Sequence, residues 1–228
     1  MTEQTKSRLL LLFSLAPWIT AAISMSFLPD QIPLHYNFAG EIDRWGSKYE
    51  EFFLAGVFSL AGFILWFMGK WNGKCADTEE ESVKAKANAK TVVTTGIVVQ
   101  LFMCVLQVGF LWSAMREIES EATTMSLPMM QVTVIGLGIL FIIMGIIMPK
   151  TRPNSMIGIR TRSSRKSPEL WRKTQVFGGV VFVAAGAITV VGGLFFEGPE
   201  GIIVLMAATL GAAILSTIYP WYLTKKKK

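Results

Sequence analysis

Six long apolar runs alternate with shorter polar segments along the chain. A helix that crosses a bilayer needs about 20 mostly apolar residues, and all six runs are close to that length or longer. The predicted spans are residues 9–28, 52–68, 91–113, 129–148, 176–196 and 201–223. The pattern therefore predicts an all-α integral membrane protein with six transmembrane helices.

Basic residues gather in alternate polar segments. Of the 22 lysines and arginines, all but Arg44, Lys48 and Arg116 lie in the N-terminal tail, the second and fourth loops and the C-terminal tail. Loops rich in Lys and Arg stay in the cytoplasm. We therefore expect both termini, and the fourth loop, to be cytoplasmic and the first loop to be extracytoplasmic.

Composition supports a membrane protein without a soluble domain. Hydrophobic residues make up 52% of the chain and charged residues only 17%, whereas a soluble domain carries about 25% charged residues. The polar loops are too short for a separate hydrophobic core. We expect one integrated bundle with three stretches: residues 1–72 (two spans and the outer loop), 73–148 (spans three and four) and 149–228 (the fourth loop and spans five and six). In the second loop, the acidic run 79–81 followed by Lys84 and Lys86 favours helix by i,i+4 pairing.

The first loop, "PDQIPLHYNFAGEIDRWGSK" (residues 29–48), has the composition of an ordered cap. Prolines stiffen its start, and Gly40 and Gly46 permit turns. We predict a short strand or turn that packs at the membrane surface and contacts a partner. The candidate partner-binding residues are Pro29, Ile32, Pro33, His35, Gly40, Asp43, Trp45 and Lys48.

His35 is the only histidine in the chain, and it leaves several interpretations open. It could bind a metal with Asp30, Glu41 or Asp43, act as a general base, or sense pH. It could equally order the loop through hydrogen bonds. One histidine among scattered carboxylates is a weak metal signature, so no metal site is predicted.

The fourth loop is rich in arginine. "NSMIGIRTR" (residues 154–162) offers a turn, and Ser167, Pro168 and Glu169 match a helix start with Ser167 as the N-cap. Arginines at 160, 162 and 165 could grip an anionic partner or a lipid phosphate, or could act only as a cytoplasmic retention signal. The candidate partner-binding residues are Asn154, Gly158, Ile159, Arg160, Thr161, Trp171 and Thr174.

Polar and small residues also mark the spans. Gln100, Cys104 and Gln107 share one face of the third span, where they could join helices by hydrogen bonds or line a transport path. Small residues predict close-packing faces in spans five and six. These residues are Gly179, Gly186, Gly193, Ala207 and Gly211.

The two loops together resemble one family. The outer loop fits Pro-x-x-Ile-Pro-x-His (residues 29–35), then Gly-x-x-Asp and Gly-x-Lys, a motif of a small bacterial domain of unknown function. The fourth loop fits Asn-x-x-x-Gly-Ile-Arg-Thr (residues 154–161) followed by Trp-x-x-Thr (residues 171–174). Both motifs occur in this order, with six spans, in SdpI-like immunity proteins. The chain departs from that pattern at Arg162-Ser163, where a proline and an aromatic residue are expected, and at Gln175, where a histidine is expected.

The resemblance implies a bacterial cytoplasmic-membrane protein that protects its cell from a secreted antimicrobial peptide. It also implies a signalling receptor that holds a small autorepressor at the membrane. The implied partners are membrane lipids, a toxin peptide outside and a small transcriptional repressor inside, without direct nucleic-acid binding. No cofactor and no enzymatic activity are expected.

Two other functions remain open from the residues alone. A transporter for a small solute or lipid would use the Gln100 and Gln107 face, although the spans carry no central ionisable group. A membrane enzyme would act through His35. The sequence carries no P-loop, zincin or nucleophile-elbow motif, and it does not predict the oligomeric state.

Overall fold

The computed structural model describes the chain except residues 1, 73–77, 126–127, 155–156 and 227–228. Six of the described helices are long and apolar enough to cross a membrane. They are α1 (Glu3–Ser24), α2 (Glu51–Asn72), α3 (Glu79–Ser120), α4 (Met129–Ile147), α5 (Pro168–Phe195) and α6 (Pro199–Lys226). The prediction of a six-span, all-α, multi-pass membrane protein is confirmed.

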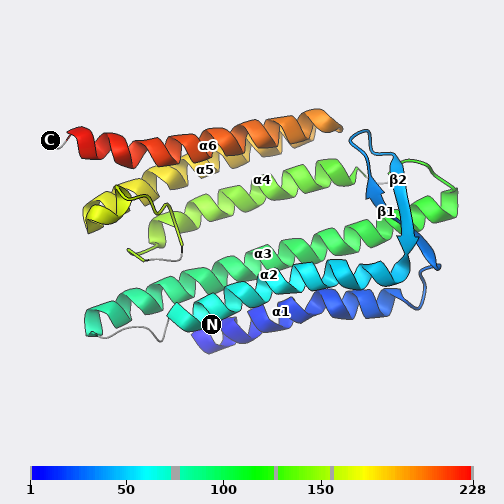
Figure 1. The fold of residues 1–228 in the computed structure, drawn as a ribbon, viewed down its shortest axis with the longest axis horizontal. Coiled ribbons are helices and arrows are strands. Elements are labelled where there is room, and N and C mark those ends of the chain that lie inside the picture. The colour runs from blue at the N-terminus through cyan, green and yellow to red at the C-terminus, as the bar shows by residue number, and fades with distance from the viewer. Residues whose placement is uncertain (1, 73–77, 126–127, 155–156, 227–228) are drawn as a thin grey trace.

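The helices form two groups of three (Figure 1). Helices α1, α2 and α3 pack on one another, α4, α5 and α6 do the same, and the α3–α4 pair carries most of the helix contact between the groups. A β-hairpin of β1 (Gln31–Tyr36) and β2 (Ile42–Ser47) lies at one end, and both termini lie at the other. We call these the hairpin end and the terminal end. Their relation to the two sides of a membrane stays a prediction.

Helix α3 is the longest element and connects the two ends. Its 42 residues extend about 63 Å at about 1.5 Å per residue, about twice the thickness of a hydrocarbon core. It begins at Glu79 rather than near residue 91, and Lys84 forms an ion pair with Glu80 at 2.5 Å. The predicted helical extension of the second loop is confirmed from Glu79 onward; residues 73–77 lie outside the described part.

The first span is shifted relative to its prediction. Helix α1 begins at Glu3, where the Thr2 side chain caps it by accepting a hydrogen bond from the Thr5 amide. The helix ends at Ser24, before the predicted boundary at residue 28. The residues that follow, including the buried Leu28, pack beneath the hairpin with Ile32 and Leu111. The apolar run that predicts the first span therefore includes residues, such as Leu28, that belong to this small core instead.

Glycines allow α4 and α5 to approach closely. A Cβ added to Gly145 would lie 2.6 Å from the backbone oxygen of Gly179, and one added to Gly186 would lie 2.5 Å from that of Gly138. The predicted close-packing face of α5 is therefore confirmed. The prediction for α6 is wrong within this chain, because a Cβ on Gly211 would meet no atom within 4 Å.

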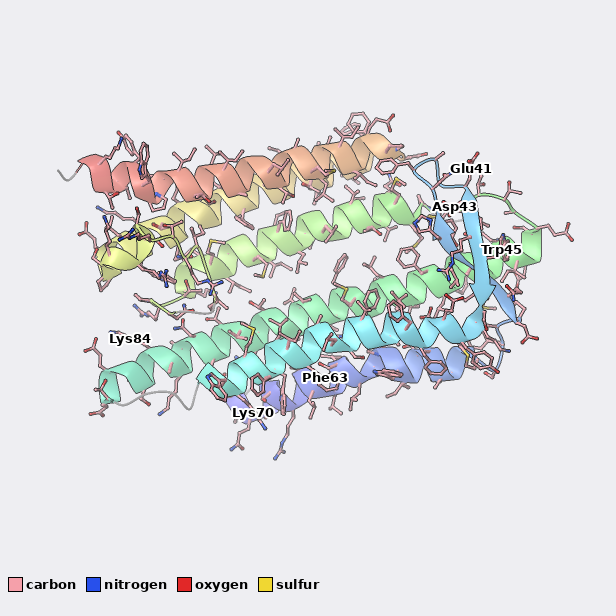
Figure 2. The ribbon with its side chains drawn as sticks, in the orientation of Figure 1. Glu41, Asp43, Trp45, Phe63, Lys70 and Lys84 are labelled. Carbon is pink, nitrogen blue, oxygen red and sulfur yellow. The ribbon has the colours of Figure 1, made fainter. Side chains whose placement is uncertain are left out.

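Short 3₁₀ helices complete the described secondary structure. They are η1 (Lys48–Glu50), which leads into α2, η2 (Met148–Lys150), which follows α4, and η3 (Ser164–Lys166), which precedes α5. Figure 2 shows Lys70 and Lys84 toward the terminal end, whereas Glu41, Asp43 and Trp45 project from the hairpin end.

Candidate functional site

The predicted ordered loop is an antiparallel hairpin. Ile32 pairs with Gly46 and His35 with Arg44, and the register is irregular between Pro33 and Tyr36. Gly40 has a φ of +80° in the connecting turn, a backbone region that glycine enters without steric cost. The Asn37 side-chain oxygen orders this turn by accepting hydrogen bonds from the amides of Ala39 and Glu41.

A buried carboxylate anchors the hairpin to α3. The Tyr36 hydroxyl donates a 2.6 Å hydrogen bond to Glu117, and the Ser113 hydroxyl donates one of 2.5 Å to the other oxygen of Glu117. The Glu117 side chain is fully buried. Burial, followed by the hydrogen bond and the charge of Glu117, raises the pKa of Tyr36 well above its ordinary value. Tyr36 therefore remains a neutral donor across the physiological range.

Backbone hydrogen bonds and an ion pair hold the hairpin at two further places. The segment after α3 extends the hairpin, since Ile42 donates to the Thr123 carbonyl and Met125 donates to that of Gly40. At the base of the hairpin, the Lys48 ammonium lies 3.1 Å from Asp30 and donates to the Leu28 carbonyl. Lys48, a candidate partner-binding residue, thus closes the base of the hairpin.

The remaining candidates in the first loop divide between interior and surface. Ile32 and Pro33 are buried, whereas Pro29, His35, Asp43 and Trp45 are exposed. Half of the eight predicted partner-binding residues of this loop are therefore exposed to a partner. Partner binding itself stays a prediction.

His35 pairs with one carboxylate. Its Nδ1 lies 2.6 Å from Asp43 Oδ1 across the two strands. The other acids proposed as co-ligands have partners of their own, since Asn37 donates to Glu41 and Lys48 pairs with Asp30. Among the described residues, no three His, Cys, Asp or Glu side chains are grouped to hold a metal. The geometry matches the loop-ordering interpretation of His35.

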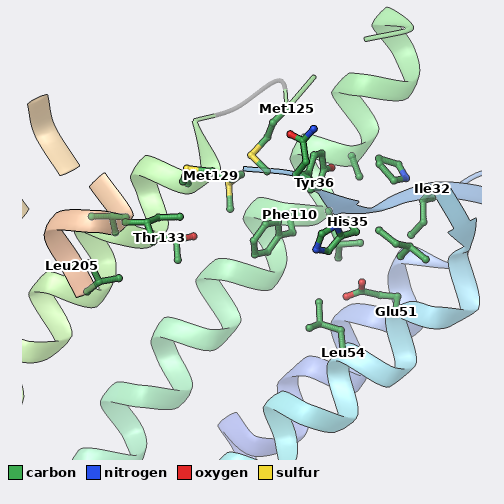
Figure 3. A pocket seen from close by; sticks show the side chains of 18 residues that line it. Ile32, His35, Tyr36, Glu51, Leu54, Phe110, Met125, Met129, Thr133 and Leu205 are labelled. Atoms are coloured by element: carbon green, nitrogen blue, oxygen red, sulfur yellow. The ribbon is translucent and has the colours of Figure 1, made fainter. Parts of the chain in front are cut away.

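A cavity of about 450 Å³ lies beneath β1, between the two helix groups (Figure 3). That volume falls within the range of about 300–1,000 Å³ typical of small-ligand sites. Residues 32–37 form its roof, and most of the rest of its wall is apolar. The apolar side chains from the helices include Leu54, Phe110, Leu111, Ala114, Met129, Met130, Val134, Ile202 and Leu205.

Glu51 gives this cavity a buried acid. It is the first residue of α2 and is only 5% exposed, and Figure 3 shows its side chain among the cavity residues. The amide of Gln107 donates to its Oε1 at 2.8 Å and to the Pro17 carbonyl at 3.1 Å. The partial positive charge of a helix N-terminus also stabilises a carboxylate there. Gln107 therefore joins α1, α2 and α3, which matches the interhelical interpretation for this one residue of the Gln100, Cys104 and Gln107 face.

Sequence reasoning did not single out Glu51 or Glu117. Both lie at the edges of apolar runs, where a charged residue usually marks the start of a loop. The sequence contains a hint of a side-chain contact for Glu117 only: Ser113 and Glu117 are four residues apart and therefore share a helix face. Their burial depends on the hairpin and on other helices, which no local pattern reveals.

The Arg-rich loop, residues 151–167, lies at the terminal end and is held by its own side chains. Asn154 accepts from the Ile157 amide and donates to the Arg152 carbonyl. Gly158 has a φ of +90°, and an added Cβ there would lie 2.7 Å from Gln175 Oε1. The conformation and the space at this position both favour glycine.

Gln175 binds this loop to α5. Its amide accepts from the Ile159 N–H at 3.0 Å and donates to the Ile159 carbonyl at 3.1 Å. One neutral side chain therefore satisfies both backbone groups of the same residue. Gln175 stands where the SdpI-like pattern has histidine, and an amide supplies this donor and acceptor without titrating.

Helix α5 begins as predicted, and its first turns support the loop. The Ser167 side chain caps the helix by accepting from the Leu170 amide at 3.2 Å. Trp171, a candidate partner-binding residue, is buried, and its ring N–H donates to the Thr151 carbonyl. Thr174 is also buried and donates to the Leu170 carbonyl. Thr161 accepts from the Ser164 amide and so starts η3.

Basic side chains form the exposed part of the Arg-rich loop. Arg152, Arg160, Arg162 and Arg165 are all exposed. The backbone of Arg152 also donates to the Asn88 side chain of α3, so α3 contacts the hairpin through Glu117 and this loop through Asn88. Binding of an anionic partner by these arginines stays a prediction.

The SdpI/YfhL protein family model matches residues 150–220. A second model, a domain of unknown function (DUF1648), matches residues 12–60. The chain is 22% identical to the immunity protein SdpI of Bacillus subtilis over 209 residues, which cover 92% of this chain and 91% of that protein. It is 38% identical to an uncharacterized protein of Archaeoglobus fulgidus over 53 residues, 23% of this chain but only 29% of the archaeal protein. No solved structure matches the chain.

The two family-model matches cover different parts of the structure. The DUF1648 match contains the hairpin and Glu51, and the SdpI/YfhL match contains the Arg-rich loop, α5 and most of α6. Residues from both matched segments line the cavity, including His35, Glu51, Ile202 and Leu205. The cavity is thus built where the two segments meet, with α3 and α4 between them.

Proposed function

We propose that this chain is a non-enzymatic membrane immunity protein that protects a bacterial cell from a secreted antimicrobial peptide. The supporting observation is the similarity to the immunity protein SdpI, which runs through 92% of the chain and so includes both the hairpin and the Arg-rich loop. The protein would reside in the cytoplasmic membrane, with the hairpin end outside as the distribution of Lys and Arg predicts.

The hairpin end has features suited to meeting such a peptide. Glu41 and Asp43 are exposed there, as are the aromatic rings of Phe38 and Trp45. Acidic side chains attract a cationic peptide, and exposed aromatic rings add contact area for an apolar one. The peptide would engage this surface before reaching deeper layers of the bilayer.

A signalling role would use the opposite end. The exposed arginines of the Arg-rich loop form a basic surface suited to an acidic face of a small cytoplasmic repressor. Helix α3 contacts both this loop and the hairpin, so a change at one end has a continuous path to the other. In this proposal, peptide binding favours the form that retains the repressor at the membrane.

Survival of a peptide-sensitive host tests the immunity function. Cells that express the chain should survive a peptide dose that kills the empty-vector host. The matched variants are Trp45→Ala on the exposed hairpin face, expected to reduce protection, and Trp112→Ala on an exposed face of α3, expected to retain it. Absence of protection, with membrane insertion verified, would refute immunity. The signalling surface is tested by repressor capture on the triple variant Arg160→Ala, Arg162→Ala and Arg165→Ala. Undiminished capture by this variant would refute the assigned surface.

A further inference from the structure

The cavity beneath the hairpin has an unequal distribution of charge. Among the 18 described residues that line it, none is Lys or Arg, and Glu51 is the only carboxylate. His35 also lines the cavity, but its Nδ1 is already paired with Asp43. The cavity therefore presents a carboxyl group without a lysine or arginine in its own wall.

Glu51 is held so that it can serve an additional partner. Gln107 donates to Oε1, and a carboxylate offers about four acceptor positions over its two oxygens. A buried charge is costly unless it is paired or hydrogen-bonded. One amide donor and the helix N-terminus satisfy part of this requirement, and a cationic ligand would satisfy the rest.

The shape and the other wall residues specify the remainder of the ligand. Side chains from α3, α4 and α6 make a largely apolar chamber, and β1 covers it. At about 450 Å³, the chamber accommodates a few side chains rather than a whole peptide. The suited occupant has a cationic group near Glu51 and apolar groups toward Met129 and Leu205.

We propose that this cavity binds an apolar peptide segment that carries one amino or guanidinium group, with Glu51 as its counter-charge. The assignment rests on the proposed function, because it makes the cavity the receptor for part of the antimicrobial peptide. The occupant would contact α2, α3, α4 and α6 at once. Its binding would therefore brace the junction between the two helix groups.

Blocked tripeptides in a binding assay test the assignment. The probes are acetyl-Leu-Lys-Leu-amide and its Gln and Glu counterparts, titrated by calorimetry against the full chain in nanodiscs. The Lys peptide should bind at least about ten-fold more tightly than the Gln peptide, a difference of about 1.4 kcal/mol, and the Glu peptide should bind more weakly still. Equal affinities for all three, or no binding, would overturn the proposal.

Glu51→Gln is the decisive variant, because its amide oxygen can still accept from Gln107 while the charge is lost. It should bind the Lys and Gln peptides with affinities within about two-fold of each other, too small a difference for a charge-assisted contact. The matched control is Glu119→Gln, which changes an exposed acid at the hairpin end of α3. This variant should retain the preference for the Lys peptide over the Gln peptide. Loss of the preference in Glu119→Gln, or its persistence in Glu51→Gln, would refute the role of Glu51.

A second variant tests the cavity itself. Ala114 is buried and lines the cavity, so Ala114→Met should occupy part of it and weaken all three peptides together. Unchanged binding in a folded Ala114→Met protein would place the peptides elsewhere. Decylamine, an apolar amine without a peptide backbone, is a further probe. If decylamine binds in a Glu51-dependent way and the Lys peptide does not bind, the occupant is not a peptide segment.

The failure of this assignment and that of immunity are distinguishable. Protection of the host without Glu51-dependent peptide binding would refute the cavity assignment and leave immunity supported. Glu51-dependent binding without protection would refute immunity and leave the cavity as a cation-selective site.

Discussion

The hairpin and the Arg-rich loop are both polar segments between membrane helices, yet they are held in different ways. The hairpin depends on distant partners: Tyr36 reaches Glu117, 81 residues along the chain, and Glu41, just before β2, bridges to Thr124 in the segment after α3. The Arg-rich loop is held mainly by Asn154, Thr161 and Gln175, which lie within it or on the next helix. One segment forms a roof over a cavity, and the other is a compact turn that presents arginines.

This difference separates residues that fold the protein from residues that can bind a partner. In the Arg-rich loop, most residues of the family motif have internal contacts, so their loss should unfold the loop. In the hairpin, several motif residues are exposed, and the anchors Tyr36 and Glu117 lie outside the positions singled out from sequence.

The largest effect is expected from Trp171→Ala. Its ring is almost fully buried, and its N–H donates to the Thr151 carbonyl. Removing a buried tryptophan costs about 3–5 kcal/mol. The free energy of unfolding in mixed micelles should fall by that amount, whereas Trp45→Ala, on a ring that is 48% exposed, should lower it by less than about 1 kcal/mol. Equal losses would contradict the contrast between the two regions.

The next effect is expected from Gln175→Leu. The change removes the acceptor of the Ile159 N–H, whereas the Ile159 carbonyl loses Gln175 but keeps the hydrogen bond from the Ser164 hydroxyl. An unsatisfied buried donor costs about 1–3 kcal/mol. Water can reach part of this loop, so we expect a loss of about 2 kcal/mol and faster hydrogen exchange at the Ile159 amide. Gln131→Leu on α4 is the control and should leave that amide protected. An unchanged exchange rate in Gln175→Leu would show that the loop is held elsewhere.

In the hairpin, Tyr36→Phe should have an effect of similar size that is confined more closely to the hairpin. It removes the hydrogen bond to Glu117, and a hydrogen bond to a charged group contributes about 1.5–3 kcal/mol. Because the hairpin lies at the end of the bundle, the loss should appear as faster exchange of the Ile42 and Met125 amides. Tyr49→Phe, on a ring that is 64% exposed, should change neither amide. Exchange that stays slow in Tyr36→Phe would assign the anchor to the backbone pairs alone.

Tyr36 also predicts a pH dependence. Its pKa is raised above the ordinary value of 10.0, first by burial and then by Glu117. Below pH 10 the phenol is protonated in both the folded and unfolded states, so it adds no pH dependence there. Above pH 10 the unfolded state loses this proton while the folded state keeps it, and stability should fall. Absorbance titration of the folded protein should show one of the four tyrosines resisting ionisation, and Tyr36→Phe should remove that resistant group.

The sequence predicted the features that depend on neighbouring residues. Apolar length gave the six helices, and the Ser167-Pro168 pair marked the start of α5. The anchoring of the hairpin was not predictable, because Tyr36 and Glu117 have no short-range relation. Glu51 was missed for a similar reason: a charge at the edge of an apolar run resembles the start of a loop until Gln107 and the hairpin bury it.

The smallest effect is expected from Asp43→Asn. The His35–Asp43 pair spans the strands at 2.6 Å, but the two side chains are 65% and 42% exposed. Exposed ion pairs contribute less than about 1 kcal/mol because water and salt screen them. Hydrogen exchange in the hairpin should therefore change less than in Tyr36→Phe, and added salt should reduce even that difference. A larger loss than in Tyr36→Phe would mean that His35 and Asp43, rather than the buried contact with α3, hold the hairpin over the cavity.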